Sequence, residues 1–283
     1  MEIVKLCSNI GNSCLFRCMK NNYYFGKTIW ITGASSGIGE ELAYLLTSAG
    51  STLILSARRE EELERVKKNC NSNNVFIYPL DLGNEDSVRT TAENVLATFP
   101  AIDILFNNGG ISQRGEAIET TLEVDRRIFE VNFFGNILLS KMVGRQMVAN
   151  KKGQIVITSS LVGKWGFYLR SSYSGSKHAL HGYYESMRME VEKSGVAISL
   201  VLPGFTQTNI SKHALKGDGT ASNELDSNQS SGLSPAFVAQ KILNGVAKKK
   251  YEISVGRTEA LGLIVRRYFP ALFHRLVRKW SAR

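Results

Sequence analysis

Short apolar runs alternate with longer amphipathic stretches between residues 28 and 255. The runs are rich in Ile, Val, Leu and Phe, and their continuous apolar character indicates strands buried on both faces of a parallel sheet. The stretches between them have helical spacing; one of them, "EELAYLLTSAG" (40–50), ends at a glycine, as helices often do. We therefore predict an α/β fold, a single doubly wound domain with a seven-stranded parallel sheet and helices on both faces. The predicted strands are 28–32, 52–56, 75–79, 102–106, 154–159, 196–203 and 251–255.

The remaining segments set the predicted domain organisation. Residues 1–24 form an N-terminal extension without a clear period, and residues 25–256 form the main domain. Within it, residues 207–234 follow the sixth strand, and the part from 216 to 234 is polar and rich in Gly, Ser and Asn. Such a segment buries little apolar surface, and ligands of these folds bind at that edge of the sheet. We expect a mobile substrate loop; a solvated surface excursion is the alternative.

Residues 257–283 are predicted to form a basic amphipathic C-terminal helix. Of the net charge of +10, the segment from Lys248 to Arg283 carries +8, with ten Lys and Arg and two Glu. Apolar residues recur on one helical face, interrupted or kinked at Pro270, at positions 261, 265, 269, 272, 276 and 280. This pattern is typical of an interfacial helix on an anionic membrane, or of a helix packed on the domain or on a partner. Nucleic-acid binding is not expected, because no known binding motif accompanies the charge.

Cysteine usage and hydropathy bear on the cellular compartment. The chain has four cysteines, with no CxxC pair and no histidine near them, so we expect no metal site. They are interpreted as reduced thiols of an intracellular protein, with lipidation of the first eighteen residues as the weaker alternative. No stretch approaches the roughly 20 apolar residues that cross a bilayer, and no secretory signal is evident. We expect a cytoplasmic protein, or one peripheral on an organelle membrane. The cysteines are Cys7, Cys14, Cys18 and Cys70.

A glycine-rich turn follows the first predicted strand. The sequence "TGASSGIGEEL" (32–42) runs from that strand into the first helix. Glycines here permit a tight turn, close approach of the backbone to a pyrophosphate, and close packing of the helix on the sheet. The free N–H groups of the helix would face the anion. The turn therefore predicts a Rossmann-type dinucleotide site at Gly33, Ser35, Ser36, Gly37, Ile38 and Gly39.

The end of the second predicted strand bears on which dinucleotide is bound. A site for NAD normally has an Asp or Glu there, to accept a hydrogen bond from the ribose. This chain has Arg58 and Arg59 instead, and a guanidinium can bind a 2′-phosphate bidentately. Ser35 could add a hydroxyl donor. We predict NADP(H); the alternative is that both arginines only balance the carboxylates of residues 60–62.

A tyrosine and a lysine lie one helical turn apart in "SSYSGSKHAL" (171–180). An unperturbed phenol has a pKa near 10, so proton transfer at neutral pH needs a decrease of roughly 2–3 units. We expect the ammonium of Lys177 to lower the pKa of Tyr173 and so make it a usable proton donor. Without other motifs, the pair would be an ordinary helix-surface feature.

Taken together, these motifs resemble the short-chain dehydrogenase/reductase family over roughly residues 26–255. The resemblance is strongest to its member 7/7B branch, because "GISQRG", "RSSYSGSKHA", "PGFTQTNIS" and "GLSPAFVAQ" are similar in sequence and place. In two places the chain departs from the family pattern: Gly110 stands where alanine is usual, and Thr206 where an aliphatic residue is common. The motifs that carry the resemblance are "TGASSGIG" (32–39), "NNGG" (107–110), "VN" (131–132), "TSS" (158–160), "YSGSK" (173–177) and "PG" (203–204).

The resemblance implies roles for individual residues. Tyr173 would exchange a proton with the substrate oxygen, and Lys177 would also hold the nicotinamide ribose. Ser160, favoured over Ser159 by the family's spacing, would hydrogen-bond the substrate oxygen. The backbone of Asn132 would hold a water that replenishes the proton; the alternative is an asparagine bonding its own helix backbone. Further cofactor contacts are expected from Asp81, Leu82, Asn107, Gly109, Pro203, Gly204, Thr206 and Thr208.

The implied function is an NADP(H)-dependent oxidoreductase that interconverts a carbonyl and a secondary alcohol. An apolar lipid-, steroid- or retinoid-like substrate is suggested by the C-terminal segment and by aromatic residues at 133–134 and 167–168, although those aromatics could equally belong to the core. The family commonly forms homodimers or homotetramers through its two long helices. The rival hypothesis is a catalytically idle NADP(H)-sensing interaction protein on a membrane surface. The complete set of Asn132, Ser160, Tyr173 and Lys177 argues against it.

Overall fold

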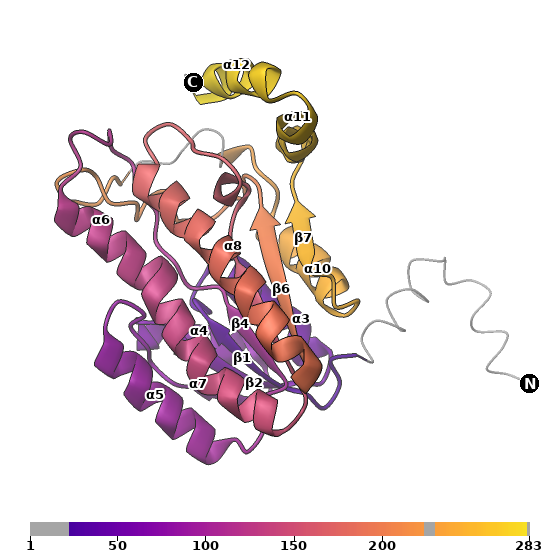
Figure 1. The fold of residues 1–283 in the computed structure, drawn as a ribbon. Coiled ribbons are helices and arrows are strands. Elements are labelled where there is room, and N and C mark those ends of the chain that lie inside the picture. Colours follow the sequence, from indigo (N-terminus) through magenta and orange to yellow (C-terminus); the bar gives the residue numbers. More distant parts are fainter. Residues whose placement is uncertain (1–22, 224–229, 282–283) are drawn as a thin grey trace, which may run out of the picture.

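A single twisted sheet organises the computed structural model, which describes residues 23–223 and 230–281 (Figure 1). All pairings are parallel and the strand order is β3-β2-β1-β4-β5-β6-β7, which confirms the predicted fold class. The strands are β1 (Thr28–Thr32), β2 (Thr52–Ser56), β3 (Val75–Ile77), β4 (Ile104–Asn107), β5 (Gly153–Thr158), β6 (Val196–Pro203) and β7 (Glu252–Val255).

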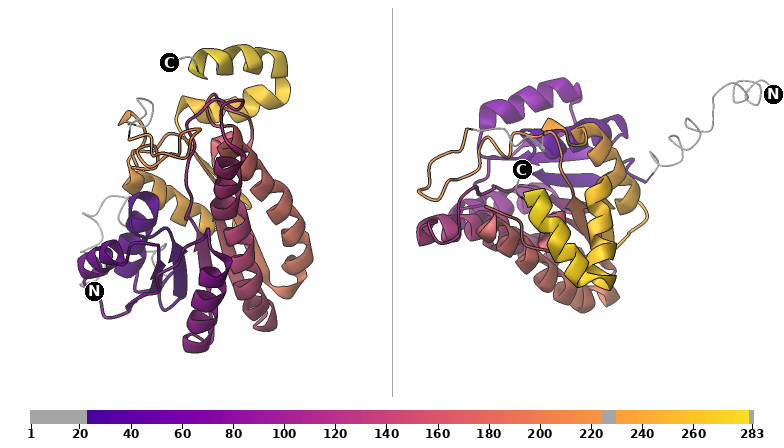
Figure 2. Two further views of the ribbon diagram at one scale, coloured as in Figure 1. Left: turned by 90° about the vertical axis from the view of Figure 1, so that its left-hand side faces the viewer. Right: turned by 90° about the horizontal axis from the view of Figure 1, so that it is seen from above.

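Helices cover both faces of the sheet, in three layers (Figure 2). One apolar core lies beneath α3 (Gly37–Ser48), α4 (Glu60–Cys70) and α10 (Pro235–Val246). The other lies beneath α5 (Glu85–Thr98), α7 (Gly135–Ala149) and α8 (Ser171–Val191). Side chains of a strand alternate between the faces, so Ile29 and Ile31 enter the first core and Trp30 the second, all fully buried.

The order of the strands fixes where a ligand can bind. The chain winds outward from β1 to β3, then returns to pair β4 with the other side of β1. In such sheets a crevice opens at the carboxyl ends of the strands where the winding reverses. Short elements follow two of these strands. The helix α6 (Leu122–Phe129) and the π-helical turn η2 (Glu130–Phe134) come after β4, and the 3₁₀ turn η3 (Leu161–Gly163) comes after β5. A further 3₁₀ turn, η4 (Glu192–Ser194), ends α8.

The C-terminal segment forms two helices and not one. After the 3₁₀ turn η5 (Thr258–Leu261) come α11 (Gly262–Tyr268) and α12 (Pro270–Ser281). Pro270 opens α12, where a missing N–H costs nothing. Both helices lie beyond the carboxyl ends of β6 and β7 (Figure 1).

The residues predicted to share one apolar face are divided between two sides of these helices: Val265 packs against the core, whereas three others are exposed. Leu261, Phe269 and Leu272 are exposed by 58%, 61% and 49%, whereas Phe273, outside the predicted face, is 1% exposed. Its ring packs on Trp165 with 5.2 Å between centroids. The chain breaks between α11 and α12, so a helical spacing counted through Pro270 no longer marks one face.

Several predictions concern residues outside the described part of the chain. The N-terminal extension, apart from its last two residues, is among them, with Cys7, Cys14 and Cys18. Cys70 is a free, half-buried thiol. Among the helices of residues 23–223 and 230–281, none is long and apolar enough to cross a membrane.

Candidate active site

A cavity of about 720 Å³ opens at the carboxyl ends of the central strands. It brings together most of the residues expected to hold a cofactor and do chemistry. Gly39, Asn107 and Asn132 do not line it. The expected residues that do are Gly33, Ser35, Ser36, Gly37, Ile38, Arg58, Arg59, Asp81, Leu82, Gly109, Ser160, Tyr173, Lys177, Pro203, Gly204, Thr206 and Thr208.

Close backbone approach explains the glycines of the first turn. Gly33 has a φ of +65°, and a Cβ there would lie 2.7 Å from the Cα of Gly109. A Cβ on Gly39 would overlap the carbonyl oxygen of Gly33, so Gly39 supports the turn from behind without facing the cavity. The resulting cradle of backbone at the start of α3 fits a pyrophosphate.

At the end of β2, Arg58 and Arg59 are exposed and line the cavity. Neither forms an ion pair with residues 60–62; Glu62 pairs with Arg65 instead, at 2.9 Å. The described contacts therefore do not support a purely balancing role for the two arginines. Arg65 also donates to Glu40 and to the carbonyl of Ser35, which ties α4 to the glycine turn.

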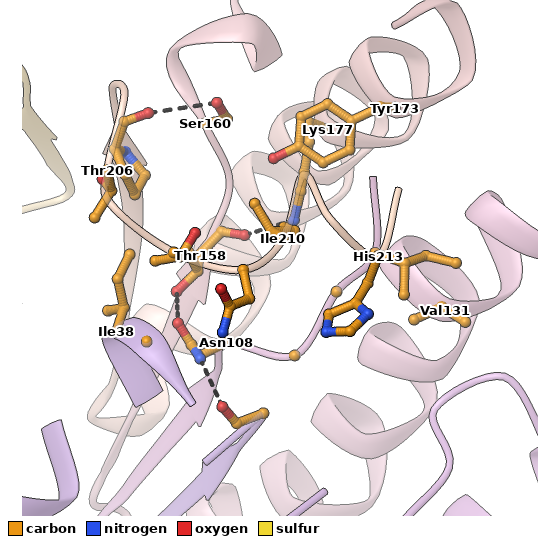
Figure 3. A pocket seen from close by; sticks show the side chains of 18 of the residues that line it. Ile38, Asn108, Val131, Thr158, Ser160, Tyr173, Lys177, Thr206, Ile210 and His213 are labelled. Carbon is orange, nitrogen blue, oxygen red and sulfur yellow. Dashed lines mark hydrogen bonds between the residues drawn. The ribbon is translucent and has the colours of Figure 1, made fainter. Parts of the chain in front are cut away.

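Asn107 is a correction to the predicted site. Its side chain is 1% exposed and points into the core, where it donates to Ser140 Oγ at 2.6 Å. The next residue, Asn108, faces the cavity, donating to the carbonyl of Thr32 and accepting from Thr158 Oγ1 (Figure 3). Successive side chains at a strand end point to opposite sides, so a shift of one residue exchanges the two roles.

Tyr173, Lys177 and Ser160 meet at the other end of the cavity (Figure 3). Tyr173 and Lys177 lie on the first turns of α8, with Lys177 Nζ 5.8 Å from the centre of the phenol ring. Nζ donates to the carbonyl of Thr158 at 2.8 Å, at the end of β5. Ser160 lies just after β5 and donates to the carbonyl of Pro203, 3.4 Å away.

The expected decrease in the pKa of Tyr173 is not found in this structure. Burial raises the pKa of Tyr173, and the positive charge of Arg170 and a hydrogen bond with Ser160 only oppose the increase. A phenolate loses its hydration in this pocket, and the nearest ammonium is turned toward Thr158. Burial also lowers the pKa of Lys177, to about 8, so its ammonium remains charged at neutral pH.

The side chain of Asn132 contacts the loop after β4 and α8, and not the backbone of its own helix. From the π-helical turn η2, its amide accepts from the N–H of Ile111 at 2.8 Å and donates to its carbonyl at 2.9 Å. It also donates to Ser176 Oγ. It therefore fixes the loop after β4 against α8, beside Lys177. The alternative for Asn132 was a hydrogen bond to its own helix backbone. Asn136 makes such bonds instead: its amide donates to the carbonyls of Val131 and Asn132.

Ser159 and Ser160 have different surroundings, as the spacing argument assumed. Ser159 is 3% exposed; its hydroxyl donates to the carbonyl of Lys177 and lies 3.0 Å from His181 Nε2. Ser160 keeps its hydroxyl on the cavity side and also caps η3 by accepting from the N–H of Val162. Both serines line the cavity, but the hydroxyl of Ser159 is engaged by Lys177 and His181. This favours Ser160 for a contact with a substrate oxygen, which stays a prediction.

The sequence analysis missed several residues of this site. Arg170, 8% exposed, donates to Ser112 and lines the cavity three positions before Tyr173. That spacing was a readable signal, since residues three apart share a helix face. Thr158 and Asn108 belong to the motifs "TSS" and "NNGG", but the sequence assigned them no role. Three others had no signal in the sequence, because they lie outside these motifs: Trp165, His213 and Glu259.

The segment after β6 lines part of the cavity; its role as a mobile substrate loop stays a prediction. Ile210, His213 and Ala221 line the cavity, and a Cβ on Gly37 would lie 2.9 Å from Cγ2 of Thr208. Thr206 pairs with Leu233 in an isolated bridge, and its hydroxyl donates to Gly204. The hydroxyl of this unusual threonine is thus used within the loop. Residues 224–229 lie outside the described part.

The aromatic residues split between core and cavity. Phe167 and Phe205 line the cavity, with 6.1 Å between ring centroids. Phe133 instead packs on Tyr183, and Phe134 is 47% exposed; neither lines the cavity.

Residues 27–218 match the protein family described as short chain dehydrogenase. The chain belongs to this family. It is 42% identical to a dehydrogenase/reductase SDR family protein 7-like of Anopheles gambiae over 235 residues, 81% of this chain and 74% of the relative. It is 33% identical to dehydrogenase/reductase SDR family member 7B of Mus musculus, over 95% of this chain and 86% of the relative.

Solved structures of the family show the same fold. A short-chain dehydrogenase/reductase from Burkholderia phymatum, solved with NAD, aligns with a TM-score of 0.78 at 23% identity, over 88% of this chain and 96% of that one. A short-chain dehydrogenase from Sphingobium yanoikuyae, solved with NADPH, aligns with a TM-score of 0.71 at 26% identity, over 81% and 87%. As a short-chain dehydrogenase, the protein is an oxidoreductase that uses a nicotinamide cofactor.

The residues present fit such a cofactor. The glycine cradle at the start of α3 would hold the pyrophosphate, and the end of β2 the adenosine ribose. Lys177 and the loop of Pro203 and Gly204 would hold the nicotinamide end. Bound there, the cofactor supplies or accepts the hydride.

Proposed function

We propose that this short-chain dehydrogenase uses NADP(H) to interconvert a carbonyl and a secondary alcohol on an apolar, lipid-like substrate. The observation that carries the proposal is that one cavity contains both the candidate catalytic residues and two arginines suited to a phosphate. Tyr173 and Ser160 meet at one end, and two exposed guanidinium groups, those of Arg58 and Arg59, lie at the other.

In the reducing direction the residues have distinct tasks. Ser160 donates a hydrogen bond to the carbonyl oxygen and so orients it. Tyr173 donates its proton to that oxygen as negative charge develops there. A phenol with a raised pKa holds its proton in the resting site, which suits a general acid. The charge of Arg170 stabilises the phenolate that remains. Lys177, charged at neutral pH and held by Thr158, would hold the nicotinamide ribose.

The preference for NADP(H) rests on charge at the end of β2. No Asp or Glu ends this strand, so nothing there selects for a ribose hydroxyl over a phosphate. Two guanidinium groups stabilise the additional charge of a 2′-phosphate through bidentate hydrogen bonds. We expect kcat/KM to be at least about tenfold higher with NADPH than with NADH.

Charge reversal at this site tests the preference. Arg58→Glu should lower kcat/KM with NADPH by about tenfold or more and leave the value with NADH nearly unchanged. Arg89→Glu is the matched control, because Arg89 is exposed on α5 and pairs only with Glu85. A wild-type protein that prefers NADH would contradict the proposal.

The apolar substrate is inferred from apolar side chains of the cavity lining. Val162, Trp165, Phe167, Phe205 and Ile210 line the cavity and present apolar surface. A substrate with a long apolar body would remove this surface from water on binding.

A substrate screen beside a Tyr173 variant tests the reaction class. Steroid, retinoid and acyl-ketone substrates would be assayed with NADPH and NADH. Tyr173→Phe should lower kcat by roughly 10²–10⁴ while NADPH still binds. Tyr183→Phe, on the same helix and distant from the cavity lining, is the control. Equal rates for wild type and Tyr173→Phe would favour a nucleotide-sensing protein without catalysis.

A further inference from the structure

The two C-terminal helices display a second apolar face, directed away from the domain. Of the large apolar side chains in the described part of the chain that are exposed, five fall within twelve consecutive residues. Leu261, Ile264 and Tyr268 lie three or four positions apart across η5 and α11, which puts them on one side of the helix. Phe269 and Leu272 continue this surface into α12. We call these five residues the outer face.

The opposite side of the same helices is fixed to the domain. Phe273 packs on Trp165, and Val265 and Val277 pack against the same core. Gly262 allows this contact, because a Cβ there would lie 3.3 Å from both the Phe273 and the Trp165 rings. The outer face is therefore presented by anchored helices, and its exposure is not the result of a detached tail.

Positive charge surrounds the outer face. Arg266, Arg267, Arg275 and Arg278 are exposed on α11 and α12, and residues 260–283 contain no Asp or Glu. Arg267 lies over the ring of Tyr268, 5.8 Å from its centre. Apolar side chains with an aromatic pair, flanked by arginines and by no carboxylate within residues 260–283, match the chemistry of a membrane interface whose headgroups are anionic.

We propose that the outer face docks on the surface of an anionic phospholipid bilayer. The apolar side chains enter the headgroup region, and the arginines bind lipid phosphates. A second copy of this chain fits less well, because a two-fold contact through this face would place like charges against each other. Thr258 and Glu259, three and two positions before Leu261, line the active-site cavity, so a docked lipid surface would lie beside its rim.

Vesicle flotation of the full chain tests the proposal. We expect binding to phosphatidylcholine vesicles that contain phosphatidylserine, and weak binding to phosphatidylcholine alone. Tyr268→Ser with Phe269→Ser should reduce binding by about tenfold or more. Met189→Ser with Phe76→Ser, at exposed positions on α8 and β3, is the matched control and should bind like wild type.

The contribution of charge is tested in the same way. Arg266→Gln with Arg267→Gln should weaken binding by about tenfold or more, and added salt should reduce the difference. The control is Lys248→Gln with Lys250→Gln, which removes the same charge from exposed positions. These positions come before β7, whereas the C-terminal helices follow it, so this variant should have little effect on binding.

Direct contact is read from a local probe, so that binding through another part of the chain does not obscure the result. In a Trp280→Phe background, Phe269→Trp should show stronger fluorescence quenching by brominated lipids than Met189→Trp. Equal quenching at both positions, or no binding of the wild type to anionic vesicles, would overturn the proposal. A Tyr268/Phe269 double variant that changes the oligomeric state without changing lipid binding would assign the outer face to a protein partner, and would also overturn it.

Discussion

Arg170, and not Lys177, is the cation that acts to lower the pKa of Tyr173 in this structure. The sequence suggested that Lys177 would make the phenol acidic, but Lys177 points to the carbonyl of Thr158. The charge that opposes the effect of burial on the pKa of Tyr173 is that of Arg170, three positions earlier at the N-cap of α8. Motif spacing identified the acid, whereas the direction of each cation depends on rotamers and hydrogen bonds that no spacing contains.

Removing this charge should move the pH dependence of catalysis. In Arg170→Met, the pKa of Tyr173 should increase further, because nothing cationic then opposes burial. The limb of the kcat/KM profile that reports the phenol should shift to higher pH relative to wild type. Arg170→Lys retains the charge and should restore the profile in part, which a purely structural role would not predict. Profiles that superimpose for wild type and Arg170→Met would rule out the effect.

The sequence could assign some residues to the site but not others, and the reason differs from position to position. The glycines, Ser160, Tyr173 and Lys177 were found because each belongs to a contiguous motif with a backbone or helix-face requirement. Asn107 and Asn108 are adjacent and chemically identical, so only the end of β4 decides which one enters the cavity. His213 and Glu259 arrive through loops, and no local pattern marks them.

At the scale of elements, strands buried on both faces were the easiest to predict. β1, β2 and β6 have the predicted bounds, and the other strands differ by one or two residues at their ends. A long apolar run between turns admits few alternatives. The C-terminal helices were harder, because the break at Pro270 changes which residues share a face.

The packing of α3 on the sheet depends on Gly39. A methyl group there would overlap the carbonyl of Gly33, so Gly39→Ala must displace either the helix or the glycine turn. We expect a loss of about 1–3 kcal/mol in the free energy of unfolding and weaker NADPH binding. Gly182→Ala is the control, since nothing lies within 4 Å of its Cβ position on α8. That variant should be neutral or slightly stabilising. Urea denaturation and NADPH titration measure both effects; equal stability of the two variants would contradict this role.

The attachment of α11 and α12 depends on Phe273. Replacing this buried ring with alanine removes its contact with Trp165 and should cost about 3 kcal/mol. Because the pair of helices is terminal, we expect part of this cost to appear as local opening, with faster amide hydrogen exchange across residues 258–278. Leu272→Ala changes a neighbouring, half-exposed side chain and should leave exchange nearly unchanged. If exchange were equally slow in both variants, other contacts would have to hold the helices.

For the whole molecule, charge is distributed unevenly between the two ends of the sequence. Of the net +10, the segment from Lys248 to Arg283 carries +8, so the rest of the chain is close to neutral. With the charge concentrated in this segment, electrostatic attraction to an anionic partner should act mainly through the surface that the segment forms. Composition alone suggested this asymmetry, but only the fold places the basic helices beside the active-site cavity.

Acid stability of the whole molecule should depend on one buried imidazole. Burial, followed by the positive charges of Lys164, His178 and Lys177, lowers the pKa of His181 to about 3, although Glu185 lies 4.0 Å away. Above the ordinary pKa of about 6.5, both folded and unfolded states hold the neutral ring. Below about pH 6.5 the imidazole of the unfolded chain binds a proton, whereas the imidazole of the folded protein stays neutral. The free energy of unfolding therefore decreases as the pH decreases toward 3.

The expected slope for His181 is at most about 1.4 kcal/mol per pH unit. His181→Gln keeps an amide near Ser159 and removes the titrating group, so its free energy of unfolding should change less between about pH 7 and pH 5 than that of wild type. His274→Gln, which changes an exposed imidazole on α12, should follow wild type. Urea denaturation at several pH values measures the slopes. Parallel curves for wild type and His181→Gln would show that carboxylates elsewhere, and not this ring, control the acid limb.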